Sequence, residues 1–181
     1  GNDRSDLDML RIVEERLLTR NDVQQFLEMI LAAVRDRLQA PGAYLMATNG
    51  SGLELVVDTG KTSLVDNEDG PEKLFQLVSQ WEMLPLMFQW GEDYLVPLVD
   101  QTQNEPKVLL GLLGISGASR ERFDEEQMQS LNLLAERATM ALRDRRIQQQ
   151  VFQSLEALTP EVDLIQRLRA AGRYGGNQAI E

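Results

Sequence analysis

Apolar residues recur every three or four positions over residues 6–20 and again over residues 21–40. This spacing predicts two amphipathic helices in succession. The apolar stripe of the first helix is Leu7, Leu10, Val13, Leu17 and Leu18. That of the second is Val23, Phe26, Leu27, Ile30, Leu31, Val34 and Leu38. Asn21 or Asp22 is expected to cap the start of the second helix, and Pro41-Gly42 to end it.

The pattern then changes to the alternation that is typical of strands. Residues 43–47 and 53–57 flank "TNGSG", whose Asn49-Gly50 pair favours a hairpin. Residues 58–71 are polar and rich in turn formers, and Pro71 can begin a short helix. Two further strands are expected on either side of Gly91-Glu92-Asp93, and a last strand over residues 107–117.

A long helix is predicted to close the domain. Its start is marked by the acidic residues 124–126, and its apolar side by Leu131, Leu134, Ala135, Ala138, Ala141 and Leu142. Ile147, Val151, Leu155 and Leu158 continue the pattern at spacings near those of a coiled coil. We therefore expect a packing helix over residues 1–20, a globular domain over 21–146, and a helical extension and tail over 147–181.

This order of elements predicts an α+β fold. It would have one antiparallel sheet of five to six strands, with the terminal helices packed on one face and residues 58–84 forming a roof on the other. The apolar run of the last strand indicates a central strand covered on both faces. We expect Val108, Leu110 and Leu112 to face one way and Leu109, Leu113 and Ile115 the other. Gly111 and Gly114 would allow a close approach to the backbone.

Charge and composition exclude several kinds of chemistry. The net charge is −11. Residues 1–142 hold 12 Lys/Arg against 24 Asp/Glu, a net charge of −12, and residues 143–181 hold 6 against 5, a net charge of +1. This acidic body argues against nucleic-acid binding. The chain has no histidine and no cysteine, so Ser–His and Cys–His catalysis, disulfides and imidazole or thiolate metal ligands are excluded. We expect no cofactor. Because no apolar run is long enough to span a membrane, we expect a cytoplasmic protein that does not bind membranes.

Three motifs resemble those of GAF domains, the small-molecule sensing modules of phytochromes, cyclic-nucleotide phosphodiesterases and bacterial signalling proteins. They are "YLVPLV", "LLGLLGIS" and "RFDEEQMQSLNLLAERATMAL", and the resemblance covers residues 21–146. It implies a profilin-like sheet with helices on one face. On the other face it implies a ligand pocket, or a collapsed apolar cavity, under the roof.

This chain lacks the residues through which several groups of GAF domains bind their ligands or act as enzymes. Its bilin-binding members attach the chromophore through cysteine, its haem-binding members use histidine, and its methionine sulfoxide reductases use cysteines, none of which exist here. The cyclic-nucleotide members share a Phe-x-x-x-Asp-Glu spacing. Here Phe123 is followed directly by Asp124-Glu125-Glu126, so that spacing fails.

Aromatic and methionine side chains cluster between the roof and the central strands. With one residue of the first strand they form the candidate ligand set: Tyr44, Trp81, Met83, Met87, Phe88, Trp90 and Tyr94. The same residues could instead form the core of a roof that has collapsed on the sheet, and we prefer this second interpretation.

Two acidic groups could in principle form sites, but neither has the pattern that a site requires. Asp66, Glu68, Asp69 and Glu72 lack the ligand spacing of an EF-hand, so a solvated loop is the simpler interpretation. Glu92 and Asp93 are adjacent on a turn and should point apart. Nothing in the nearby sequence indicates that they are desolvated, so they make a poor acid/base pair.

The sequence therefore favours a non-catalytic sensor or regulatory module of bacterial signal transduction, with a small-molecule ligand and a downstream partner that it does not identify. Dimerisation is expected through the terminal helices, by way of Leu10, Val13, Leu17, Ile147, Val151 and Leu155. The alternative is a protein–protein interaction scaffold of related fold that binds no ligand.

Overall fold

The computed structural model describes residues 20–63, 70–101 and 106–157. Helix α2 spans Arg20–Leu38 and therefore begins ahead of both predicted caps. It ends where Gln39 adopts a left-handed backbone conformation with φ 49°, before Pro41-Gly42. Helix α4 spans Glu125–Ala157 as one continuous element, so it crosses the predicted boundary at residues 146–147 without a break. Asp124 caps α4, because its Oδ1 accepts a hydrogen bond from the Gln127 amide at 2.8 Å.

Five antiparallel strands form one sheet in the order β2-β1-β5-β4-β3. Strands β1 (Gly42–Thr48) and β2 (Leu53–Gly60) make the predicted hairpin, and Gly50 has the positive φ that its turn requires. Strands β3 (Phe88–Trp90) and β4 (Asp93–Asp100) flank the second turn, and β5 (Val108–Ser116) is central. The predicted α+β architecture is confirmed.

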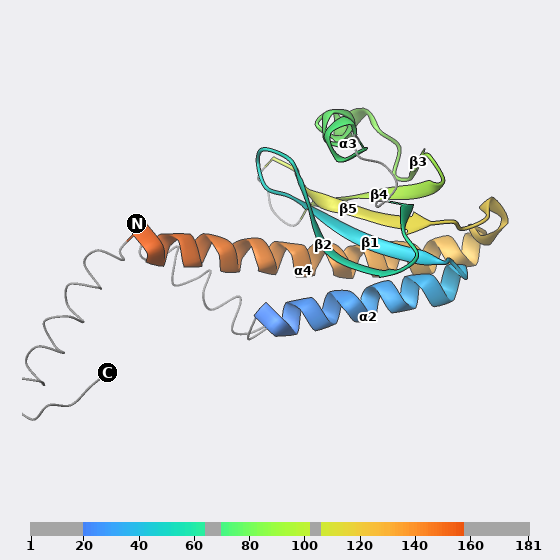
Figure 1. Ribbon diagram of the computed structural model, residues 1–181, viewed down its shortest axis with the longest axis horizontal. Coiled ribbons are helices and arrows are strands. Elements are labelled where there is room, and N and C mark those ends of the chain that lie inside the picture. Colours follow the sequence, from blue (N-terminus) through green and yellow to red (C-terminus); the bar gives the residue numbers. More distant parts are fainter. Residues whose placement is uncertain (1–19, 64–69, 102–105, 158–181) are drawn as a thin grey trace, which may run out of the picture.

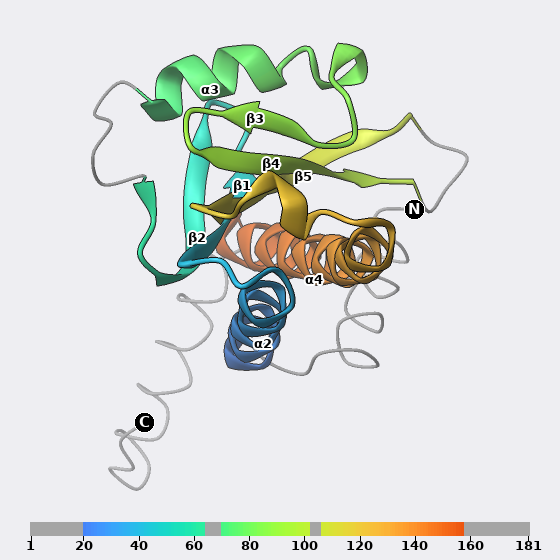
Figure 2. The same ribbon diagram turned by 90° about the vertical axis from the view of Figure 1, so that its right-hand side faces the viewer.

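The two faces of the sheet are covered by different layers (Figures 1 and 2). We call the face that carries Leu45 and Leu113 the helix face, and it packs against α2 and α4. The opposite face, which we call the roof face, carries Tyr44, Leu95 and Leu112. Helix α3 (Gly70–Val78) lies over the roof face and buries Leu74 and Val78 against it. The short helix η2 (Trp81–Met83) continues the roof.

The strict alternation expected along β5 is broken at Leu110. Val99 pairs with Leu109 and Leu98 with Gly111, so Leu110 is an extra residue opposite that step of β4. Leu110 therefore joins Leu113 and Ile115 in the helix-face core, whereas Leu109 and Leu112 belong to the roof face. The predicted grouping of Leu110 with Leu112, and of Leu109 with Leu113, was wrong because a bulge shifts the phase of the strand. A Cβ at Gly111 would meet the Met46 carbonyl and the Leu142 side chain of α4, as the expected close approach requires.

Candidate ligand-binding site

The roof face carries a compact apolar cluster beneath α3. Its buried members are Tyr44, Met46, Leu74, Val78, Leu95, Leu109 and Leu112, and its partly buried members are Leu53, Trp81, Leu84, Phe88, Trp90 and Val99. Four of the seven predicted ligand residues, Tyr44, Trp81, Phe88 and Trp90, are thus brought together in this cluster.

The other three predicted residues lie elsewhere. Met87 and Tyr94 pack against the helix-face core, where the Tyr94 ring centroid is 4.6 Å from that of Phe123. Met83 is 84% exposed. Alternation explains Tyr94, because its side chain must point away from the face that Leu95 occupies. The predicted set therefore spans both faces of the sheet, and a single roof-face pocket takes in only part of it.

A buried carboxylate lies at one end of the roof-face cluster. The Tyr44 hydroxyl donates a hydrogen bond of 2.6 Å to Asp93 Oδ2, and the Ser63 hydroxyl donates one of 2.6 Å to the same oxygen. Asp93 is only 1% exposed, whereas its neighbour Glu92 is exposed on the turn. The expectation that nothing desolvates this pair was therefore wrong for Asp93. Asp93 is the first residue of β4, and its side chain enters the roof face.

Two glycines leave the space that Tyr44 and residues 61–63 occupy beside Asp93. Gly114 lies opposite Tyr44 in the sheet, and a Cβ at position 114 would overlap the Tyr44 ring, with the ring Cε1 only 2.6 Å away. A Cβ at Gly42 would run into the Lys61 carbonyl, so this glycine allows residues 61–63 to lie directly on the sheet. Ser63 reaches Asp93 from that segment.

Asp93 belongs to a row of residues that crosses the roof face. Ser116 of β5 lies opposite Asp93 on one side and opposite Gly42 on the other, and Trp90 of β3 lies opposite Asp93. Ser116 is buried, and neither its Oγ nor Asp93 Oδ1 makes a hydrogen bond within the described part of the chain. Ser63 and Ser116 were not predicted as site residues, and Asp93 was considered only as half of a poor acid/base pair with Glu92. Counting by twos back from Leu95 and forward from Gly114 would have placed Asp93 and Ser116 on this face.

The environment of Tyr44 gives a first testable prediction, which concerns alkaline pH. Burial, and then the hydrogen bond to Asp93 and its charge, raise the pKa of Tyr44 well above its ordinary value of 10.0. Above that pH the unfolded chain loses this proton while the folded chain keeps it, so stability falls as pH rises. Relative to a Tyr44→Phe variant, the free energy of unfolding should fall by about 1.4 kcal/mol per pH unit.

Urea denaturation in steps upward from about pH 9 would measure this slope for both proteins. The neutral-pH difference between the two proteins supplies the pH-independent cost of the substitution. Parallel pH profiles would contradict the prediction.

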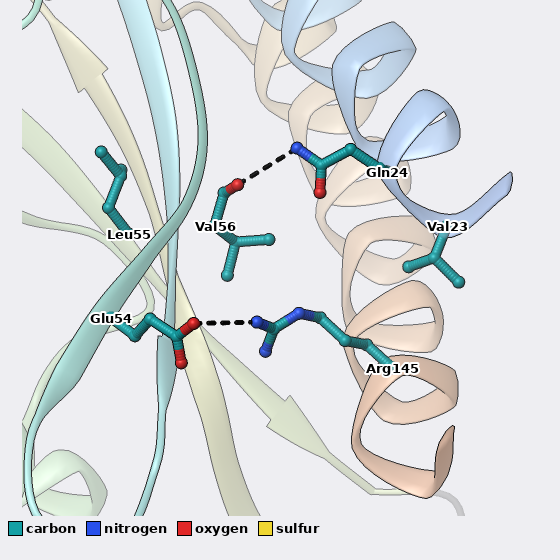
Figure 3. Close-up of a pocket in the computed structure, with 6 residues that line it drawn as sticks. All are labelled: Val23, Gln24, Glu54, Leu55, Val56 and Arg145. Carbon is teal, nitrogen blue, oxygen red and sulfur yellow. Dashed lines mark hydrogen bonds and ion pairs between the residues drawn. The ribbon is translucent and has the colours of Figure 1, made fainter. Parts of the chain in front are cut away.

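A separate pocket of about 180 Å³ lies between β2, the start of α2 and α4 (Figure 3). Gln24 Nε2 donates to the Val56 carbonyl at 3.2 Å, and Arg145 Nη2 donates to Glu54 Oε1 at 3.1 Å across the pocket. These contacts attach the edge strand β2 to both helices. Because the charges of Glu54 and Arg145 offset each other, the pocket presents no net charge to an ionic ligand. No residue of the predicted ligand set lines it.

The residues predicted for dimerisation differ in their exposure. Ile147 is buried, Val151 is partly buried and Leu155 is 59% exposed; the neighbouring Phe152 is 63% exposed. Leu10, Val13 and Leu17 lie outside the described residues. The apolar stripe of α4 thus becomes more exposed toward its C-terminal end.

The acidic segment and the helices give two limited findings. Asp66, Glu68 and Asp69 lie outside the described residues, and Glu72 is exposed in the first turn of α3. Within residues 20–63, 70–101 and 106–157, no group of three or more carboxylates is placed to hold a metal ion. Among the helices of this same part of the chain, none has the length and apolar character needed to cross a membrane.

Comparisons with known proteins find similarity of structure only. No family model matches the chain. No curated protein matches it either. PelD from Pseudomonas aeruginosa is 19% identical with a TM-score of 0.51, over 77% of this chain and 47% of that one.

Two solved GAF structures are also similar. The GAF domain of a phosphoenolpyruvate-protein phosphotransferase from Coxiella burnetii is 17% identical with a TM-score of 0.48, over 82% of this chain and 98% of that one. A GAF domain/HD domain protein from Geobacter sulfurreducens is 12% identical with a TM-score of 0.49, over 68% of this chain and 94% of that one. The resemblance to GAF domains is confirmed as a resemblance of fold, and no ligand or activity carries across at these identities.

Proposed function

We propose that this chain is a non-catalytic regulatory module with a GAF-type fold, which binds a small molecule on the roof face and acts as a homodimer joined through its terminal helices. The observation that carries the proposal is α4. Its 33 residues extend about 50 Å, and in Figure 1 its C-terminal part runs on past the sheet. A change in how the roof packs on the sheet reaches α4 through the sheet, since β4 and β5 both contact this helix.

The proposed occupant of the exposed end of α4 is a second copy of the chain. Val151, Phe152 and Leu155 lie on one side of the helix at spacings of one, three and four residues. Ile147 is buried, whereas Val151 is partly buried and Phe152 and Leu155 are exposed. A helical seam of this spacing pairs readily with an identical seam about a two-fold axis.

Light scattering on a sizing column tests the dimer. The intact chain should elute with twice the 20.5 kDa mass of one chain, and Phe152→Glu/Leu155→Glu should convert it to a monomer. The matched control is Leu133→Glu, which charges another exposed leucine of α4, away from its C-terminal end, and should leave the dimer intact. A monomeric intact chain would contradict the proposal. If the intact chain is a monomer but a chain lacking residues 1–19 is a dimer, residues 1–19 compete with the second copy for Val151, Phe152 and Leu155.

A second candidate function is a scaffold that binds other proteins and no small molecule. The observation in its favour is that the roof already fills its own space, since Leu74 is 1% exposed and Val78 0%. A thermal-shift screen separates the two functions. A module of the first kind is stabilised by at least one class of small molecule, whereas a scaffold of the second kind responds to none.

A further inference from the structure

We infer that Asp93, Ser116 and Trp90 form a recognition site for a protonated amine at the end of the roof-face cluster. The inference rests on the proposed ligand-sensing function and adds the chemical class of the ligand. It starts from the charge of Asp93. This carboxylate is 1% exposed, and among the described residues its hydrogen-bond partners are the hydroxyl groups of Tyr44 and Ser63, which are neutral. A buried carboxylate is usually paired with a cation, and no described residue supplies one here.

The two oxygens of Asp93 have different surroundings. Oδ2 accepts both hydrogen bonds, whereas Oδ1 is buried and accepts none from the described residues. Ser116 lies directly opposite on the same face, and its Oγ is also buried without a hydrogen bond in that part of the chain. Two polar atoms left over at adjacent positions are uncommon in a folded core. A group that donates two hydrogen bonds and carries a positive charge satisfies both atoms and neutralises the carboxylate.

The aromatic neighbour points to the same chemistry. Trp90 lies opposite Asp93 on its other side and shares the roof face, where it is only partly buried. The face of an indole ring attracts a cation electrostatically, and most strongly where water is excluded. An ammonium group between Asp93 and Ser116 therefore has an anion, a hydroxyl acceptor and an aromatic ring around it. A primary amine fits better than a quaternary ammonium ion, because only the former donates hydrogen bonds.

Entry to this site requires a movement of its cover. The segment Lys61–Ser63 lies over the sheet at Gly42, and Ser63 holds it there by its bond to Oδ2. Lys61 is exposed, and Thr62 and Ser63 are partly exposed, so this segment is the accessible part of the cover. Binding at Oδ1 leaves both hydrogen bonds at Oδ2 in place. The cover can therefore close again over a bound amine.

Thermal unfolding with simple amine probes tests the inference. n-Butylammonium chloride should raise the melting temperature of the intact chain by about 3–5 °C at a concentration about tenfold above its dissociation constant. Tetramethylammonium chloride and sodium chloride at equal ionic strength should raise it far less. The rise should disappear in Asp93→Asn and persist in Asp58→Asn, which neutralises an exposed carboxylate on β2.

Ser116→Ala gives a variant that is expected to fold, because its hydroxyl makes no hydrogen bond in the described part of the chain. It should weaken the response to butylammonium several-fold without lowering the melting temperature of the protein alone. Equal responses to butylammonium and sodium, or a response that survives both substitutions, would overturn the inference. If neutral or anionic compounds stabilise the protein while amines do not, the inference fails and the proposed sensing function stands.

Discussion

Gly114→Ala should lower the stability of the domain by at least about 3 kcal/mol, at the upper end of what overpacking a core costs. The new Cβ would overlap the ring of Tyr44, which is fully buried. The ring cannot swing aside cheaply, because its hydroxyl is bound to Asp93 and its edges lie among buried side chains. The melting temperature should fall by about 6–12 °C for a chain of this size.

Two comparisons isolate the cause. Gly52→Ala places a Cβ where nothing lies within 4 Å, so it should change stability little. In a Tyr44→Leu background the ring is absent, and Gly114→Ala should then cost less than half of what it costs in the native chain. Urea denaturation of the native chain, Tyr44→Leu, Gly114→Ala and the double variant gives the coupling energy between positions 44 and 114. Equal losses in both backgrounds would show that the strain lies in the backbone of β5 and not against Tyr44.

The order of elements could be predicted because it depends on local patterns. The change of period after residue 42, the Asn49-Gly50 turn and the acidic start of α4 each act within a few residues. The phase of β5 could not be predicted, because its bulge at Leu110 depends on pairing with β4. Strict alternation is a good first approximation for a strand, but one extra residue moves all the following side chains to the opposite face of the sheet.

The candidate site was only half predictable for a similar reason. Composition and sequence clustering indicated Trp81, Phe88 and Trp90, which are apolar and lie near one another in the chain. Asp93 was not predicted as a site, because it is adjacent to Glu92 on a turn and nothing in the nearby sequence indicates that it is desolvated. What buries it is the approach of residues 61–63 and of Tyr44, which are 30 and 49 positions away in sequence. Gly42 and Gly114 make that approach possible, and no local pattern shows it.

Asp93→Ala should cost about 2–4 kcal/mol, because it removes the acceptor of two hydrogen bonds and leaves the buried Tyr44 hydroxyl without a partner. Asp93→Asn should change stability by less than about 1 kcal/mol, since its amide oxygen can accept both of these hydrogen bonds. Urea denaturation at neutral pH measures both differences. Equal losses for alanine and asparagine would mean that the negative charge of Asp93, and not its acceptor oxygen, stabilises the fold.

The pairing of Tyr44 with Asp93 also predicts strong non-additivity. In a Tyr44→Phe background, Asp93→Ala leaves no buried tyrosine hydroxyl without an acceptor. Asp93→Ala should therefore lower the free energy of unfolding clearly less than it does in the native chain. Removing the carboxylate together with its main donor also relieves the burial of an unpaired charge, which opposes folding. A small cost of Asp93→Ala in the Tyr44→Phe background would show that the buried carboxylate and the buried phenol mainly satisfy each other, as expected if Asp93 also receives the positively charged group proposed above. An equal cost in both backgrounds would contradict the predicted coupling.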